Sequence, residues 1–179
     1  MQFPRGVPAP SAWVARHAGL VPKAGPVLDL AAGGGRHSRY FLDLGHPVTA
    51  VDRDVSRLTG LAGAEIIAAD LEDGSPWPLD GRRFAGIVVT KYLFRPLLPR
   101  IAAALGPGGV LIYETFSLGQ ERHHKPRNPA HLLRPGELLD FAEQAGLVTR
   151  AYFCGTVDGP QPSMRQAISN RPSPTLFTE

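Results

Sequence analysis

The sequence has a single cysteine and no long apolar run, and both shortages exclude classes of protein. Because Cys154 is the only cysteine, the chain cannot form an internal disulfide or a cysteine-rich zinc site, which agrees with a reducing compartment. No apolar stretch approaches the roughly 20 residues that span a bilayer, and the proline-rich segment 1–10 lacks the apolar centre of a secretory signal. We therefore expect a cytoplasmic protein without membrane contact or metal, in which Cys154 serves packing.

Lysine is scarce as well, since it occurs only at Lys23, Lys91 and Lys125 and the other basic residues are arginines. The formal net charge is +3. A balance of this size permits contact with nucleic acid or with an acidic substrate without requiring either. We interpret most of it as solvated surface charge.

The sequence does contain short apolar runs that alternate with segments of helical spacing, over a length that suits one domain. This alternation is typical of an α/β protein with helices on both faces of a parallel sheet. Most of the runs are apolar throughout, as strands covered on both faces must be. Strands are expected at 26–32, 47–52, 65–70, 84–90 and 109–116.

Helices are expected before the first strand and between the later ones. The N-terminal helix, at about 11–19, has Ser11 as its N-cap residue. In the last helix Pro135 suits the first turn and Gly146 the C-terminal stop. The other predicted helices span 36–44, 55–62, 96–105 and 135–146.

After the last helix, the segments 147–154 and 163–170 predict two further strands that close the sheet as an antiparallel edge. The single domain then has a core at about 25–155 and a C-terminal edge strand at 163–170. The tail 171–179 has no periodicity, so we expect it to be mobile. The fold class is a Rossmann-like, doubly wound, mostly parallel sheet.

Two connections are predicted to be irregular. The segment 71–83 contains two prolines and two glycines, so a loop is expected there in place of the usual crossover helix. The segment 117–134 is also irregular, and structureless connections longer than about 12 to 15 residues are uncommon unless they are functional or disordered. We interpret 117–134 as a candidate lid.

The stretch VLDLAAGGGRH, at 27–37, predicts a buried strand that runs into a glycine loop and then a helix. In a doubly wound sheet such a loop lies at the carboxyl edge, where ligands bind. Gly33 and Gly35 let the backbone approach a ligand, and the helix N-terminus attracts an anionic group. The alternative is a tight turn that binds nothing.

Two carboxylates follow where a nucleoside ligand needs them. Asp52 ends the second predicted strand and can accept hydrogen bonds from both hydroxyls of a ribose. Asp70 ends the third strand and can accept from the exocyclic amine of an adenine. Asp54 is better explained as the cap of the next helix, although it could replace Asp52 if the strand boundary shifts by two residues. The alternative for Asp52 and Asp70 is that strand ends often carry aspartate simply because turns favour it.

The first turn distinguishes between two cofactors that offer adenine and ribose. A dinucleotide fingerprint reads G-x-G-x-x-G or A, whereas this sequence reads GGGRHS from Gly33 and places Ser38 at the position of the small packing residue. Asp29 lies beneath the loop, where it repels a pyrophosphate but attracts an ammonium group. The loop therefore favours S-adenosylmethionine over NAD.

In order and spacing, the motifs LDLAAGGGRHSRYF, VTAVDRD, AADLEDGSPWPL and LGPGGVLIYETF resemble those of class I S-adenosylmethionine-dependent methyltransferases. The resemblance covers residues 11 to about 155 and is closest to the small bacterial tellurite-resistance-like group, to which YLFRPLL and NPAHLLRPGELL are also similar. By that resemblance Asp29, Gly33 and Gly35 hold the methionine portion of the cofactor, and Asp52 holds the ribose. Ala31 stands where the superfamily usually has its first loop glycine, so its φ is expected to stay negative.

The same resemblance implies that Asp70 and the Leu71 backbone hold the adenine and that Arg53 lies over the adenine face. Two departures fall after the fourth strand, beside the methyl-transfer pocket. Lys91 replaces an expected asparagine, and Phe94 stands near an expected histidine. Cofactor binding is therefore better supported by the sequence than activity is.

Methyl transfer from a sulfonium mainly requires alignment and exclusion of water. Tyr92 and Arg95 follow the fourth strand and are the candidates to line the acceptor pocket and to pair with an acidic acceptor. Glu114, near the end of the fifth strand, is the candidate base or orienter, with a structural pairing to an arginine as the alternative. Tyr92 as simple packing is the alternative for that side chain.

The leading hypothesis is methyl transfer to a small molecule. The basic run 121–127 in the candidate lid leaves open an RNA or protein substrate, and Lys91 and Phe94 leave open a cofactor-binding module without turnover. Trp13 and His17 share a helix face that can cover the cofactor cleft, and Trp77 can shield the adenine, although packing explains all three.

Overall fold

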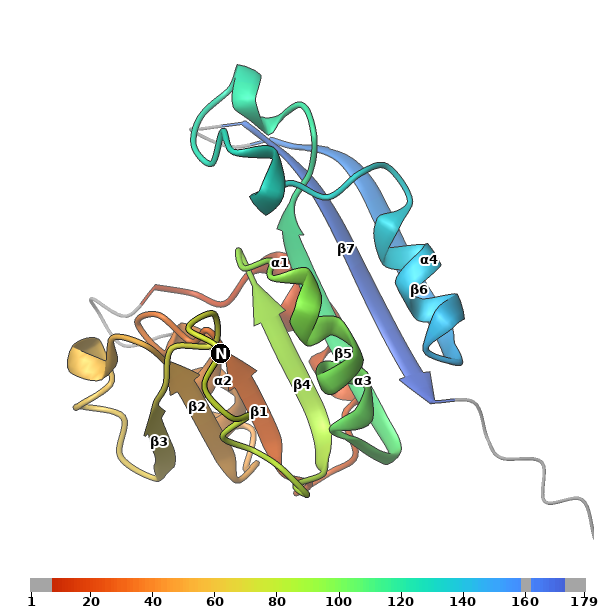
Figure 1. Cartoon of the computed structure of the whole chain (residues 1–179). Coiled ribbons are helices and arrows are strands. Elements are labelled where there is room, and N and C mark those ends of the chain that lie inside the picture. The colour runs from red at the N-terminus through yellow and green to blue at the C-terminus, as the bar shows by residue number, and fades with distance from the viewer. Residues whose placement is uncertain (1–7, 159–161, 173–179) are drawn as a thin grey trace, which may run out of the picture.

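The apolar runs of the sequence form one seven-stranded sheet in the computed structural model, which describes residues 8–158 and 162–172 (Figure 1). The strand order is β3-β2-β1-β4-β5-β7-β6, with β1 to β5 parallel and β7 antiparallel to both of its neighbours. This is the predicted Rossmann-like α/β architecture. The strands are β1 Val27–Leu30, β2 Val48–Asp52, β3 Ala64–Ala68, β4 Phe84–Thr90, β5 Leu105–Phe116, β6 Leu147–Val157 and β7 Ser163–Pro172.

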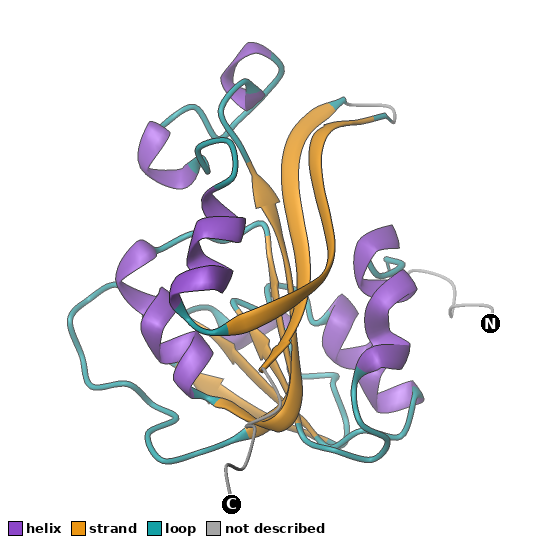
Figure 2. Ribbon diagram, turned by 90° about the vertical axis from the view of Figure 1, so that its right-hand side faces the viewer, coloured by secondary structure: helices purple, strands orange, loops and turns teal. Residues whose placement is uncertain are grey.

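Helices cover both faces of the sheet, as Figure 2 shows. Helices α1 and α2 pack on one face, and α3 and α4 pack on the other. The Ser11 hydroxyl accepts a hydrogen bond from the Val14 N–H at 3.1 Å, which confirms the predicted cap. No helix in the described ranges is long and apolar enough to cross a membrane. The α-helices are α1 Ala12–His17, α2 Arg36–Asp43, α3 Leu98–Ala103 and α4 Glu137–Gln144; the 3-10 turns are η1 Ala18–Leu20, η2 Val55–Arg57, η3 Arg95–Leu97, η4 Gln120–Arg122 and η5 Pro129–His131.

The alternation of side chains along β4 explains why the strands are apolar throughout. Ile87 and Val89 are buried with α3 and α4, whereas Val88, one position between them, is buried with α1 and α2. Successive side chains of a strand point to opposite faces, so a strand covered on both sides needs no polar positions.

Two helix predictions need correction. The predicted helix 55–62 is a single 3-10 turn, η2, which Asp54 caps by accepting a hydrogen bond from the Ser56 N–H at 3.0 Å. Gly60 and Gly63 follow within a few residues, and a segment this short and glycine-rich cannot sustain a helix. The predicted helix 96–105 ends at Ala103, because Leu105 already pairs with Phe84 in the sheet. The helix-free loop predicted at 71–83 is confirmed.

The two last strands close the sheet as the predicted antiparallel edge, but 163–170 is not the outermost of them. Strand β7 hydrogen-bonds β5 on one side and β6 on the other, so β6 is the edge strand. Cys154 lies on β6 and is exposed, which corrects the expectation that it serves packing. Strand β7 also takes in residues 171–172 of the predicted tail, and 173–179 lie outside the described residues.

Candidate cofactor and acceptor site

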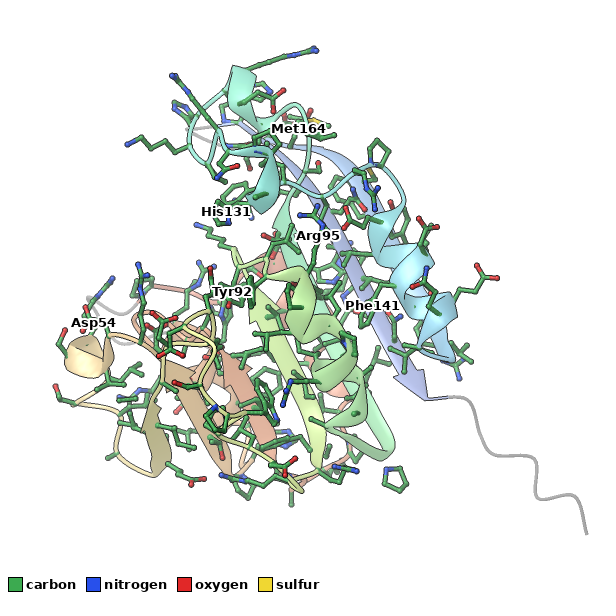
Figure 3. All side chains as sticks on the ribbon, in the orientation of Figure 1. Asp54, Tyr92, Arg95, His131, Phe141 and Met164 are labelled. Carbon is green, nitrogen blue, oxygen red and sulfur yellow. The ribbon has the colours of Figure 1, made fainter. Side chains whose placement is uncertain are left out.

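A cavity of about 490 Å³ lies at the carboxyl edge of the sheet, where the strand order reverses between β1 and β4. This is the position at which open α/β sheets bind ligands. The segment 117–134, called the cap segment here, borders the cavity with Pro126 and His131. Figure 3 shows Tyr92, after β4, and His131, in the cap segment, on the two sides of this region.

The loop after β1 adopts the left-handed conformation three times. Ala31, Gly33 and Gly35 have φ values of +55°, +58° and +70°. The prediction of a negative φ at Ala31 is therefore wrong, because the chain turns into the cavity at this residue whether or not it is glycine. At Gly35 a Cβ would lie 2.8 Å from Leu58 Cδ2, and the φ of +70° favours glycine there.

Asp52 joins the end of β2 to this loop. Its Oδ2 accepts a hydrogen bond from the Gly33 N–H at 2.7 Å, and its Oδ1 accepts from the Asp54 N–H at 3.0 Å. Asp52 and the neighbouring Arg53 both line the cavity. The Gly33 N–H thus fixes the Asp52 carboxylate at the cavity wall, at the strand end where the sequence places it.

Asp29 is buried beneath the loop, but it binds a different group from the one expected. Its Oδ2 accepts hydrogen bonds from the Ser38 N–H at 2.9 Å and the Ser38 hydroxyl at 2.6 Å, one turn into α2. Burial raises the pKa of Asp29 to about 6, and the hydrogen bonds from Ser38 oppose that rise. Ser38, which breaks the dinucleotide pattern, therefore stabilises the carboxylate, and Asp29 itself does not line the cavity.

The acidic side of the cavity follows β3. Asp70 and Leu71 line it as predicted, together with Glu72, which the sequence analysis did not select. Asp70 Oδ1 accepts a hydrogen bond from the Glu72 N–H at 2.9 Å, the turn geometry that favours aspartate at this position. One carboxylate thus shapes the turn and faces the cavity.

Tyr92 lies at the junction of the acidic and basic sides. Burial raises the pKa of its hydroxyl well above the usual range, and the nearby Glu72 carboxylate raises it further. This buried hydroxyl has no well-formed hydrogen bond to any residue of the described ranges. Tyr92 therefore keeps its proton at neutral pH and has a donor at the cavity wall, with the Glu72 carboxylate as its nearby acceptor.

The basic side of the cavity centres on Lys91. This residue has a φ of +54°, and its backbone N–H donates to the Glu114 carbonyl at 2.9 Å. The pKa of its ammonium group is lowered by burial first and then by the charges of Arg36 and Arg165. No local pattern in the sequence points to Arg36 or Arg165, because 129 positions separate them and only the sheet brings them together.

Glu114 does not line the cavity. Its Oε1 accepts a hydrogen bond from Arg165 Nη1 at 2.7 Å, and the carboxylate is buried. This is the structural pairing that the sequence analysis gives as the alternative to a catalytic role. The Arg165 guanidinium also lies over the Phe116 ring, 5.5 Å from its centroid, and Phe116 does line the cavity.

Arg95 does not face the cavity, contrary to the prediction. It forms an ion pair with Glu137 on α4 through hydrogen bonds of 2.5 and 3.0 Å, and it donates to the Ala130 and Leu132 carbonyls at 2.7 and 2.9 Å. Its guanidinium is therefore saturated by groups that join α4 to the cap segment. Phe94, the second departure from the resemblance, packs against the core on the α3 and α4 face.

Other contacts fasten the cap segment to β7. Gln120 is buried and accepts a hydrogen bond from the Met164 N–H at 2.9 Å, and Gln166 donates to the Arg134 carbonyl at 2.5 Å. The candidate lid is thus tied down at both ends in this structure. Its charged run 121–127 is mostly exposed.

The aromatic residues considered for the cleft serve packing. The Trp13 and His17 rings pack at a tilt of 49° with centroids 4.2 Å apart, and the Trp13 indole donates to the Ile168 carbonyl at 3.4 Å. Trp77 is buried in the core cluster of the α3 and α4 face. None of the three lines the cavity.

The doubly wound sheet, with a glycine loop at its switch point and a carboxylate at the end of β2, has the fold of solved S-adenosylmethionine-dependent methyltransferases. No protein-family profile and no curated protein matches the sequence. Solved structures do match: the 1,6-didemethyltoxoflavin-N1-methyltransferase of Burkholderia thailandensis has a TM-score of 0.68 at 24% identity, covering 91% of this chain and 77% of that one.

Two further structures belong to the tellurite-resistance group. TehB of Haemophilus influenzae has a TM-score of 0.69 at 18% identity and covers 89% of this chain, which spans 61% of TehB. A TehB-like S-adenosylmethionine-dependent methyltransferase of Corynebacterium glutamicum has a TM-score of 0.64 at 22% identity, with 88% and 85% coverage. The resemblance stated from the sequence is confirmed at the level of the fold.

Proposed function

We propose that this protein transfers a methyl group from S-adenosylmethionine to a small-molecule acceptor. The observation that carries the proposal is Asp52, which lines the cavity at the end of β2 and is fixed by the Gly33 N–H at 2.7 Å. A carboxylate held there can accept hydrogen bonds from both ribose hydroxyls. The Burkholderia structure contains S-adenosylhomocysteine and a small-molecule acceptor, which supports the same assignment.

The residues of the cavity suit the rest of the cofactor. Asp70 and the Leu71 backbone would hold the adenine, with Arg53 over its face. The loop from Ala31 to Gly35 would hold the methionine portion, with Asp29 as a buried negative charge behind it. Arg36 is the first residue of α2, directly after this loop, so it would pair with the cofactor's carboxylate.

When bound, the cofactor supplies a methyl group that the sulfonium has already activated, so the protein needs only to align the acceptor and exclude water. Tyr92 keeps its proton, and we assign it to orient the acceptor by donating a hydrogen bond. Glu114 acts through Arg165 and is a positioning residue. Arg95 contributes by holding the cap segment over the cavity.

The exposed basic run 121–127 favours one second candidate, a methyltransferase that binds RNA through the cap segment. Affinity for RNA must then fall steeply with added salt. Methylation of components of a metabolite extract by radiolabelled S-adenosylmethionine supports the small-molecule proposal instead. Cofactor binding without methylation of any acceptor pool supports the third possibility, a module without turnover.

The decisive experiment is calorimetric titration with S-adenosylhomocysteine of the intact protein and of Asp52→Ala, with NAD as the control ligand. Micromolar binding by the intact protein, its loss in the variant and no response to NAD are the expected results. A folded protein that does not bind S-adenosylhomocysteine overturns the proposed function. Measurable NAD binding would point to an oxidoreductase.

A further inference from the structure

Three cations surround one carboxylate at the end of the cavity that the adenosine site does not use. Lys91 lines the cavity after β4, Arg36 begins α2, and Arg165 lies on β7. All three interact electrostatically with Glu114 or bind it directly. These residues come from four separate elements, so only the folded sheet assembles the cluster.

The charges of this cluster do not balance. Arg165 is neutralised by its 2.7 Å ion pair with Glu114. Neither the Arg36 guanidinium nor the Lys91 ammonium has a hydrogen bond or an ion pair with any residue that the structure describes. Two positive charges therefore remain without a bonded partner. Burial lowers the pKa of both groups; the charge of Arg165 lowers that of Arg36 further, against the opposing Glu114 and Asp29 carboxylates, and the charges of Arg36 and Arg165 lower that of Lys91.

The proposed function accounts for one of these two charges, because the cofactor carries a single carboxylate and Arg36 lies beside the loop that would hold it. Lys91, which is partly exposed to solvent, is then left on the cavity wall without a bonded partner among the described residues. Its left-handed backbone conformation, with φ at +54°, is strained for a side chain of this type, and such strain concentrates at functional sites.

The surroundings of Lys91 suit an organic anion. Phe116 gives the cavity an aromatic surface, and the Arg165 guanidinium, paired with Glu114, lies over the same ring. His131 borders the cavity from the cap segment, and Tyr92 offers a hydroxyl donor beside Lys91. Donors and cations are gathered there, with an apolar wall for the body of a ligand.

We propose that the methyl acceptor is an organic anion whose carboxylate or phosphate group binds Lys91, against Phe116. This inference rests on the proposed function, since it assigns the second anion after the cofactor carboxylate has been paired. Lys91 thereby selects for anionic substrates. By the resemblance, a neutral asparagine is expected at this position.

Benzoate, phenyl phosphate and the uncharged benzamide test this proposal as probes, titrated into protein already saturated with S-adenosylhomocysteine. In the saturated protein the carboxylate of S-adenosylhomocysteine already pairs with Arg36. The probe therefore cannot bind Arg36 in place of Lys91. We expect benzoate or phenyl phosphate to bind the saturated protein and benzamide to bind at least about tenfold more weakly, the effect of one charge-assisted hydrogen bond. The anion that binds better identifies carboxylate or phosphate as the group.

Lys91→Met should lower the affinity for the anionic probe by about tenfold or more and leave that for benzamide unchanged. Lys23→Met is the matched control, because Lys23 is exposed in the turn before β1, at the opposite edge of the sheet. Equal binding of benzoate and benzamide, no effect of Lys91→Met, or displacement of S-adenosylhomocysteine by benzoate would each overturn the inference. Failure of S-adenosylhomocysteine to bind at all is a separate result, which overturns the proposed function.

Discussion

The carboxylate of Asp52 holds the Gly33 N–H at 2.7 Å and the Asp54 N–H at 3.0 Å, so that one side chain joins the glycine loop to the turn after β2. Each oxygen serves one donor. Any ligand that uses this carboxylate therefore meets a group whose position is fixed before binding, which lowers the entropic cost of association.

Asp52→Asn should weaken both the fold and cofactor binding. An amide has only one oxygen, so one of the two backbone N–H groups loses its acceptor, at a cost of about 1 to 3 kcal/mol. Denaturant unfolding and calorimetry with S-adenosylhomocysteine measure the two effects. Asp54→Asn is the control, because Asn caps nearly as well as Asp and this exposed side chain does not line the cavity. Equal behaviour of the two variants contradicts the role of Asp52.

Ala31→Gly should maintain or raise stability, by up to about 1 kcal/mol, because glycine relieves the left-handed strain at φ +55° and this gain exceeds or offsets the added freedom of the unfolded chain. Ala32→Gly should instead destabilise by about 1 kcal/mol, since Ala32 is buried and lacks a positive φ. Denaturant midpoints of the two variants provide the comparison. The opposite ranking would contradict the left-handed backbone conformation of Ala31.

Arg95→Met should loosen the cap segment. It leaves the buried Glu137 carboxylate without its main partner and frees the Ala130 and Leu132 carbonyls. Breaking a fully buried pair costs about 3 to 5 kcal/mol, and we expect less here because Arg95 is partly exposed and Glu137 keeps the Arg134 N–H at 2.8 Å. Hydrogen exchange should accelerate within 117–134 more than in β1 or β4. Arg100→Met on the exposed side of α3 is the matched control. If Arg95 served an acidic substrate instead, exchange would stay unchanged.

Asp29→Asn should alter how stability depends on pH. The pKa of Asp29 in the folded protein is about 6, against about 3.8 in the unfolded chain, so the folded state binds more protons between these values. The contribution of Asp29 to the unfolding free energy is therefore full below pH 3.8 and falls by about 3 kcal/mol as the pH rises to 6. The variant should lack this fall.

His37 titrates in the same range with the opposite sign, since burial lowers its pKa to about 3 and its neutral ring links Ser11 to Thr90. Its contribution is full above the unfolded value of 6.5 and is lost as the pH falls toward 3. The measurement is thus the difference between the unfolding free energies of the wild type and Asp29→Asn at several pH values. A difference that does not change with pH contradicts the assignment.

Glu114→Gln separates a positioning role from a catalytic one. Because Glu114 holds Arg165 and does not line the cavity, the variant should lower turnover modestly and leave the shape of the kcat pH profile unchanged. Loss of the acidic limb of the profile, with turnover abolished and S-adenosylhomocysteine affinity intact, would establish Glu114 as the general base. Arg165→Met should reproduce the modest effect.

Features that depend on interactions between residues close in the sequence were predicted correctly, and features that depend on distant residues were not. Strands β1 to β5 and the cap at Ser11 were predictable, because apolar runs and cap residues act within a few positions. The helix expected at 55–62 was wrong because glycine spacing outweighs a weak pattern. The negative φ expected at Ala31 failed because the backbone path is set by the loop as a whole.

By itself, the sequence determined the Rossmann-like order of elements and the carboxylates at the ends of β2 and β3, since both follow from local patterns read in chain order. Tertiary structure alone decided what those patterns do. It placed β7 inside the sheet, paired Arg95 with Glu137 over 42 positions, and paired Glu114 with Arg165 over 51 positions. Whether a charged side chain forms an ion pair depends on its neighbours in space. Strand pairing brings those neighbours together from positions too far apart in the sequence for a local pattern to predict.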